Sequence, residues 1–116
     1  MLEIGSCSSV KPYLCGVGGQ GWSLVNSEAL NVREEELMPG CSETPHKHEL
    51  ASQSYYILKG YGQVVIQDKT LKLTQGDCVL IPPSYVHIIS NESQEPLRFL
   101  VISSPPINED RIEVEF

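Results

Sequence analysis

Residues 40–60 read GCSETPHKHELASQSYYILKG, a stretch bounded by glycines. It carries His46 and His48, two positions apart, and Gln53 stands five positions further on. Side chains at positions i and i+2 of a strand point to the same face of a sheet, so the two imidazoles can reach one point. Imidazole nitrogen is the commonest metal ligand in proteins. The H-x-H spacing therefore predicts a metal site built on a strand.

A metal site needs a further ligand, and the chain holds one more histidine, His87. It lies in a second patterned stretch, residues 76–91, which reads GDCVLIPPSYVHIISN. All three histidines of the chain thus fall within two patterned stretches, which favours metal binding over three unrelated structural roles.

The first stretch resembles the first motif of the cupin superfamily, which runs from a glycine through H-x-H and a glutamate to a second glycine. Gly40, His46, His48 and Gly60 stand at the family positions. Gln53 replaces the glutamate, and this is the departure with the largest chemical consequence.

The second stretch resembles the second cupin motif, which contains a glycine, P-x-G, a histidine and an asparagine. Gly76, Pro82, His87 and Asn91 match it, and Ser84 stands where the family has glycine. The resemblance implies an all-β fold: a cupin-type jelly roll, or double-stranded β-helix barrel, with one metal ion inside.

The resemblance also implies the metal ligands, which are His46, His48, Gln53 and His87. They would hold one divalent ion per chain, with zinc, nickel, iron, manganese and copper all open. Such a set leaves positions for water or substrate, as catalytic metal sites do. All four ligands are neutral, so the ion keeps its full charge and is expected to be a strong Lewis acid. Gln53 cannot act as a general base.

Short apolar runs separated by turn residues indicate strands along most of the chain, and no window shows the period of a helix. We expect one domain over residues 1–116, with an N-terminal arm at 1–20 and an edge strand at 111–116. The expected strands are 22–26, 30–38, 43–49, 53–59, 62–67, 70–73, 77–81, 86–90, 97–103 and 111–116.

The two-residue period of a strand then assigns side chains to the barrel interior. If Gln53 points inward, so do Tyr55 and Ile57. Alignment from the second motif places Phe99 and Val101 inside as well. Ile57, Phe99 and Val101 are therefore predicted to line the cavity.

A run of four charged residues, REEE, leaves two alternatives open. Either Arg33 and Glu35 face the cavity or Glu34 and Glu36 do, although a charged run more often forms a solvated face. Tyr55, Arg33 and Glu35 are the candidates for catalytic proton transfer. An inward tyrosine can equally well only fill the barrel.

The resemblance implies a metal-dependent enzyme that acts on a small molecule. Similar three-histidine-plus-glutamine cupins include a polyketide cyclase and a uronate ring-opening enzyme. They imply cyclisation, isomerisation, lyase or ring-opening chemistry on an oxygenated substrate such as a sugar acid or phenolic. A metal-dependent dioxygenase is an alternative, because a site with open positions can also bind oxygen. A non-catalytic small-ligand binding or sensor module is another, since a fold does not determine a reaction.

Composition narrows the partners and the compartment. A net charge of −7 and a pI near 4.8 argue against nucleic-acid binding, and no apolar run has the length of a membrane span. The start of the chain lacks a signal-peptide pattern, and the four cysteines form no C-x-x-C pair, so free thiols in the cytoplasm are expected. Ile112, Val114 and Phe116 give the last strand an apolar face, which a homodimer would bury.

Overall fold

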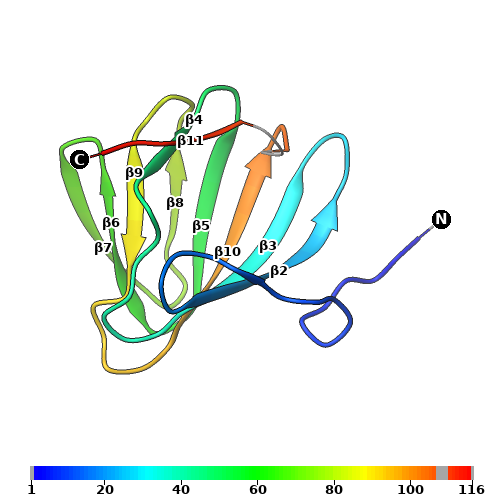
Figure 1. Ribbon diagram of the computed structural model, residues 1–116, viewed down its shortest axis with the longest axis horizontal. Helices are drawn as coiled ribbons and strands as arrows, with labels where there is room; N and C mark the ends of the chain where they lie inside the picture. The colour runs from blue at the N-terminus through cyan, green and yellow to red at the C-terminus, as the bar shows by residue number, and fades with distance from the viewer. Residues whose placement is uncertain (1, 107–109, 116) are drawn as a thin grey trace.

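The computed structural model describes residues 2–106 and 110–115. Within these ranges the chain forms strands only, so it holds no helix of the length and apolarity that a membrane crossing needs (Figure 1). The strands are β1 (Tyr13–Leu14), β2 (Gly19–Asn26), β3 (Asn31–Leu37), β4 (His46–His48), β5 (Ser52–Lys59), β6 (Tyr61–Ile66), β7 (Lys69–Thr74), β8 (Cys78–Ile81), β9 (His87–Ser90), β10 (Leu97–Ser104) and β11 (Arg111–Glu113).

Two antiparallel sheets enclose one apolar core. One sheet has the strand order β1-β2-β3-β10-β5-β8, and the other has the order β11-β4-β9-β6-β7. Most neighbouring strands are distant along the chain, as in a jelly roll. The predicted all-β jelly-roll fold is therefore confirmed. The core side chains are Leu37, Tyr55, Ile57, Val64, Leu73, Ile81, Ile89, Leu97, Phe99 and Val101.

The pairing of β5 with β10 determines which side chains reach the interior. Every second side chain of β10 is buried from Leu97 to Ser103. Phe99 lies opposite Ile57, and Val101 lies opposite Tyr55. Since directly opposite residues share a face of the sheet, these four side chains pack together inside the molecule. Their contact with a ligand stays a prediction.

The pairing of β3 with β10 decides between the two alternatives for the REEE run. Glu35 lies opposite Phe99, and Arg33 lies opposite Val101. These two charged side chains therefore share the inward face. The other two glutamates of the run point outward, where both form ion pairs with Arg98.

β4 is shorter than the sequence predicts. The expected strand 43–49 is wrong at both ends, because β4 spans His46–His48. Pro45 has no N–H for a strand ladder, which is consistent with a strand that begins after it. On the other side, the Asp110 carboxylate accepts hydrogen bonds from the backbone N–H groups of residues 49–51 and so holds them in a turn.

Segments from the two ends of the chain lie on the same face of the molecule (Figure 1). The arm expected at 1–20 already contains β1 and the start of β2, so it is more ordered than a loop. Of the edge strand expected at 111–116, the structure has β11 at the edge of the five-stranded sheet, and residue 116 lies outside the described residues. β11 pairs with β4 and thus runs beside the strand that carries two of the histidines.

Ser84 has a left-handed backbone conformation at the position where the second motif has glycine, with φ of 71°. Its N–H donates to the His48 carbonyl oxygen, which holds the turn in place. A side chain in this conformation costs about 1–2 kcal/mol, which exceeds the entropic cost of glycine. Ser84→Gly is therefore expected to raise the free energy of unfolding by about 0.5–1 kcal/mol.

Urea denaturation measures this change. Ser54→Gly is the matched control, because Ser54 lies in the extended strand β5 and its replacement should lower the free energy of unfolding. A Ser84→Gly protein less stable than the wild type would contradict the strain at this turn.

Candidate metal centre

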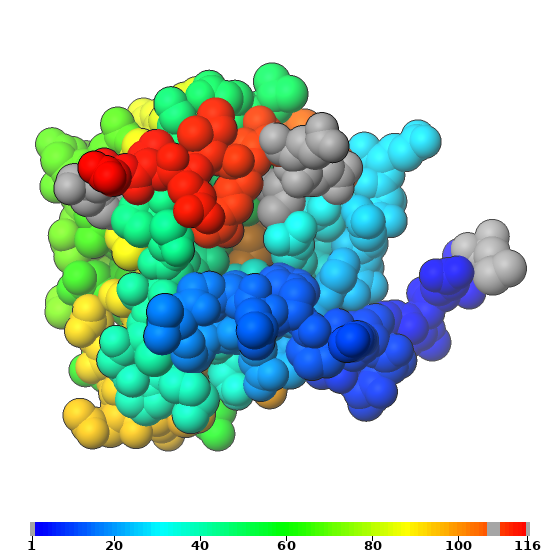
Figure 2. Space-filling view, viewed as in Figure 1, coloured from blue at the N-terminus to red at the C-terminus, as the bar shows by residue number. Residues whose placement is uncertain are grey.

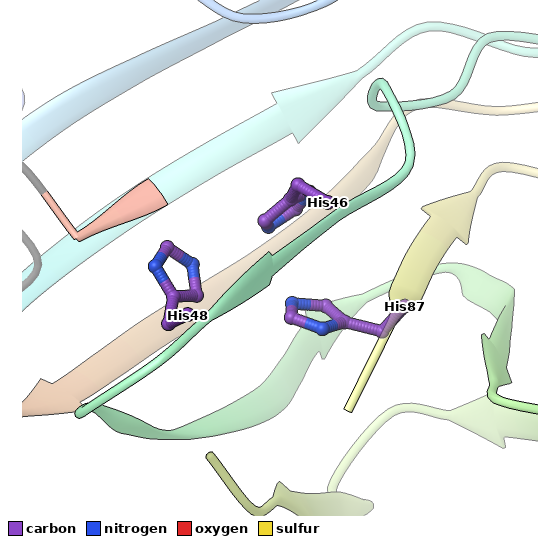
Figure 3. Close-up of side chains that lie close together, drawn as sticks. All are labelled: His46, His48 and His87. Carbon is purple, nitrogen blue, oxygen red and sulfur yellow. The ribbon is translucent and has the colours of Figure 1, made fainter. Parts of the chain in front are cut away.

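The three histidines gather in the interior of the molecule (Figure 3). His46 and His48 project from β4, and His87 projects from the neighbouring β9, where it is the cross-strand partner of His46. One ring nitrogen of each lies within 4.8 Å of the other two. Each histidine is at most 2% exposed. The cluster has the donor type and spacing that can hold a metal ion.

Backbone carbonyls orient two of the rings. Nδ1 of His46 lies 2.8 Å from the carbonyl oxygen of Thr44, and Nδ1 of His87 lies 2.9 Å from that of Tyr85. When each Nδ1–H donates to its carbonyl, Nε2 carries the lone pair. Metal-binding histidines ordinarily have this arrangement, with the second ring nitrogen held by the protein.

Gln53 reaches the cluster from β5 in the opposite sheet. Its Oε1 lies 3.0 Å from Nε2 of His87, and its Nε2 donates to Ser103 Oγ at 2.9 Å. A neutral imidazole has one proton, so His87 cannot donate both to the Tyr85 carbonyl and to Gln53. When the His87 proton is on Nδ1, Nε2 and Oε1 each present a lone pair, and His87 and Gln53 would both be able to hold a metal ion.

His48 is a second sign that the residues fit a metal ion. Both of its ring nitrogens are buried, and neither has a hydrogen-bond partner in the described part of the chain. Buried polar atoms are ordinarily paired, and an unpaired one costs about 1–3 kcal/mol. A metal ion bound to one of these nitrogens would remove that atom's share of the cost. Three imidazoles and an amide oxygen therefore fit a divalent ion.

Burial keeps the imidazoles neutral. Loss of hydration, followed by repulsion from a charge on His87, lowers the pKa of His46 to about 3 and that of His48 to about 4. Burial also lowers the pKa of His87. Neutral imidazole is the form that binds metals, so the cluster is in its binding form at neutral pH.

Tyr55 connects the histidines to a buried acid that the sequence analysis did not single out. The centroid of its ring is 5.9 Å from that of His87, and its O–H donates to Glu43 Oε1 at 3.0 Å. Both Tyr55 and Glu43 are buried. Burial, followed by the neighbouring carboxylate, raises the pKa of Tyr55, so its phenol is a neutral hydrogen-bond donor.

Glu43 escapes the sequence pattern for a structural reason. Strand alternation counted back from His46 would put residue 43 on the outer face. The alternation does not apply there, because β4 begins at His46. Residue 43 lies between Gly40 and His46, where the first motif specifies no residue, so the sequence carries no direct signal for Glu43.

Glu43 and Glu35 line a surface pocket of about 270 Å³. Arg33 lines it too, so two of the three residues predicted to move protons face one pocket, and the third, Tyr55, contacts it through Glu43. Residues 13–16 and β11 form its borders. Figure 2 shows the N-terminal segment in blue and the C-terminal segment in red on this same face of the molecule.

Comparison with known proteins assigns the family. Residues 33–103 match the Cupin domain family model. An uncharacterized protein of Methanocaldococcus jannaschii is 35% identical over 110 residues, which cover 90% of this chain and 88% of that protein. An oxalate-binding protein of Thermotoga maritima is 31% identical over 84 residues, which cover 68% of this chain and 69% of that protein. The structure of the polyketide cyclase RemF from Streptomyces resistomycificus matches with a TM-score of 0.83 and 21% identity, covering 100% of this chain and 87% of RemF. The chain belongs to the cupin family.

Proposed function

We propose that this chain is a metal-dependent enzyme that acts on a small oxygenated molecule. In this proposal His46, His48, Gln53 and His87 hold one divalent ion. The observation that carries it is the approach of His87 Nε2 to Gln53 Oε1 at 3.0 Å in a buried site. When His87 carries its proton on Nδ1 and donates it to the Tyr85 carbonyl, Nε2 and Oε1 both present lone pairs at that distance, and a bound cation would satisfy them.

The bound ion would supply Lewis-acid polarisation of a ligand oxygen atom. Because Gln53 is not a base, other side chains must move protons. Tyr55, Arg33 and Glu35 take this role in the proposal, since the last two line one pocket and Tyr55 lies between that pocket and His87.

The proposed reaction is a cyclisation, an isomerisation, a ring opening or a lyase-type elimination. A sugar acid or a phenolic compound would suit such chemistry, because its adjacent oxygens can bind a Lewis-acid metal. RemF, a polyketide cyclase of the same fold, is the example from which this class is proposed. The side chain of Ile112 on β11 is 40% exposed. The proposal includes the expected homodimer, which would bury this apolar side chain.

A non-catalytic ligand-binding module is the second candidate function. Two observations favour it: the histidines are almost fully buried, and one relative at 31% identity is an oxalate-binding protein. In such a module the metal would orient a ligand or stabilise the barrel.

Elemental mass spectrometry combined with Gln53→Glu tests the proposal. We expect about one divalent ion per chain in both proteins, because the cupin motif has glutamate at this position. The added negative charge weakens the Lewis acid, so activity should fall by about tenfold or more. A rise in activity would instead indicate base-assisted oxygenase chemistry.

Gln63→Glu on β6 is the matched control, because it adds the same charge to a partly exposed position of the strand. The metal found selects the assays: zinc leads to cyclase, isomerase and lyase screens, and iron, nickel or copper leads to oxygen-uptake measurements. Protein that takes up no metal on reconstitution would overturn the enzyme proposal in favour of the binding module.

A further inference from the structure

We infer that Glu43 and Glu35 share a single proton and form the acid–base group of the pocket between the N-terminal segment and β11. The shared proton follows from the geometry of the pocket, whereas its use in a reaction rests on the proposed function. Neither glutamate belongs to the matched motif positions or to the proposed metal ligands.

Glu35 has one carboxylate oxygen with a donor and one without. The Tyr13 O–H donates to Oε2 at 2.5 Å. Oε1 is buried and has no hydrogen-bond partner among the described residues, and the side chain as a whole is 4% exposed. Since buried polar atoms are ordinarily paired, this oxygen calls for a proton donor beside it.

Glu43 can be that donor. Its Oε1 already accepts from Tyr55, which leaves the other oxygen to carry a proton. Burial, then the charge of Glu35, raises the pKa of Glu43 well above its ordinary value. Two neighbouring buried carboxyl groups do not both ionise readily, so one proton serves the pair.

The surrounding groups balance the charge of this pair. Arg111 lowers the pKa of Glu43, but burial and Glu35 have larger, opposite effects. The thiol beside the pair is neutral, because burial and the two glutamates raise the pKa of Cys15 to about 12. The ionisable side chains that face the pair are Tyr13, Cys15, Arg33, Tyr55, Arg111 and Glu113.

A ligand in the pocket can exchange a proton with this pair. When a ligand oxygen takes the proton, the O–H bond of Glu43 breaks and an O–H bond of the ligand forms. The pair is then left as two carboxylates, and Arg33 and Arg111 at the same pocket offset their charge. The reverse transfer restores the acid. In this exchange at Glu43, Tyr55 acts by positioning, because its O–H donates to Glu43 Oε1.

Infrared spectroscopy of protein with ¹³C-labelled glutamate tests for the shared proton. At pH 7 we expect the C=O stretch of one protonated glutamic acid per chain, and we expect Glu43→Gln to lose it. Glu34→Gln is the control and should keep the band, because Glu34 lies on the outer side of β3 with Arg98. In Glu35→Gln the band should disappear at a lower pH than in the wild type.

Two results would overturn the shared proton: a wild-type protein without the band at pH 7, and a Glu43→Gln protein that retains it. Identical titration of the band in the wild type and Glu35→Gln would overturn the sharing, and this comparison does not require Glu43→Gln to fold.

Metal content of the same samples separates the two proposals. A band without metal supports the shared proton and overturns only the proposed enzyme. Metal without a band overturns only the shared proton. Once an activity is identified, Glu43→Gln should lower kcat by about 100-fold while the metal stays bound. An unchanged kcat would overturn the acid–base role.

Discussion

His87→Ala is expected to lower the affinity of the site for a divalent metal by at least about 100-fold. Loss of a contact that only supports a ligand costs about 10–100-fold, and this change removes a proposed ligand itself. It also removes the nitrogen that faces Gln53 Oε1 at 3.0 Å. Chelator competition measures the affinity. Thermal unfolding of the same samples should show that the metal no longer stabilises the variant. For the wild type this stabilisation is about 4 kcal/mol when the free metal concentration is a thousand times Kd.

Two further variants make this result specific. Lys47→Ala changes the side chain between the two β4 histidines, which points outward to Glu49, and it should keep the metal. His48→Ala should lose the metal without leaving a hydrogen-bond partner unpaired, because both ring nitrogens of His48 lack one in the described part of the chain. Stoichiometric metal in His87→Ala would contradict the ligand assignment.

Strand alternation and motif spacing were sufficient to predict the fold and the gathering of the histidines. The H-x-H pair is a local pattern, since two residues on one strand share a face whatever lies around them. The same logic placed Ile57, Phe99 and Val101 inside, where the structure has them. The glycine position of the second motif also has a physical reason, because Ser84 there has a positive φ.

Contacts between distant segments could not be read from the sequence. The REEE run places charged side chains on both faces of its strand, so the sequence pattern does not show which face is inward. The pairing of Glu35 on β3 with Phe99 on β10 shows it. The bond from Gln53 to Ser103 likewise depends on strand register over 50 residues. Glu43 was missed because it precedes β4, where the period of a strand no longer applies.

The free energy of unfolding of the wild type is expected to fall as the pH rises above about 4.5, the ordinary pKa of glutamate, and Glu43→Gln is expected to reduce this fall. Burial and Glu35 raise the pKa of Glu43 well above 4.5 in the folded protein, whereas the unfolded chain has the ordinary value. Between the two pKa values the folded protein holds one more proton than the unfolded chain. The free energy of unfolding therefore falls by about 1.4 kcal/mol per pH unit.

The sign of this slope distinguishes the influences on Glu43. The stability due to its raised pKa is complete below the unfolded value and is lost as the pH rises through the folded one. Urea unfolding in chelator at several pH values measures it, with Glu34→Gln as the control. Subtracting the free energy of unfolding of Glu43→Gln from that of the wild type at each pH removes the contribution of the titratable groups common to both proteins.

Parallel curves of the free energy of unfolding against pH for the two proteins would mean that Glu43 has the same pKa in the folded and unfolded states. A wild-type stability that rises with pH relative to Glu43→Gln would mean that the charge of Arg111 outweighs burial. In Glu43→Gln the amide oxygen can still accept the Tyr55 hydrogen bond. A variant more stable than the wild type at pH 8 would therefore have lost only the titratable proton. Such a result would mean that the wild-type chain keeps a carboxyl group at this position at a cost in stability, as proton-transfer sites commonly do.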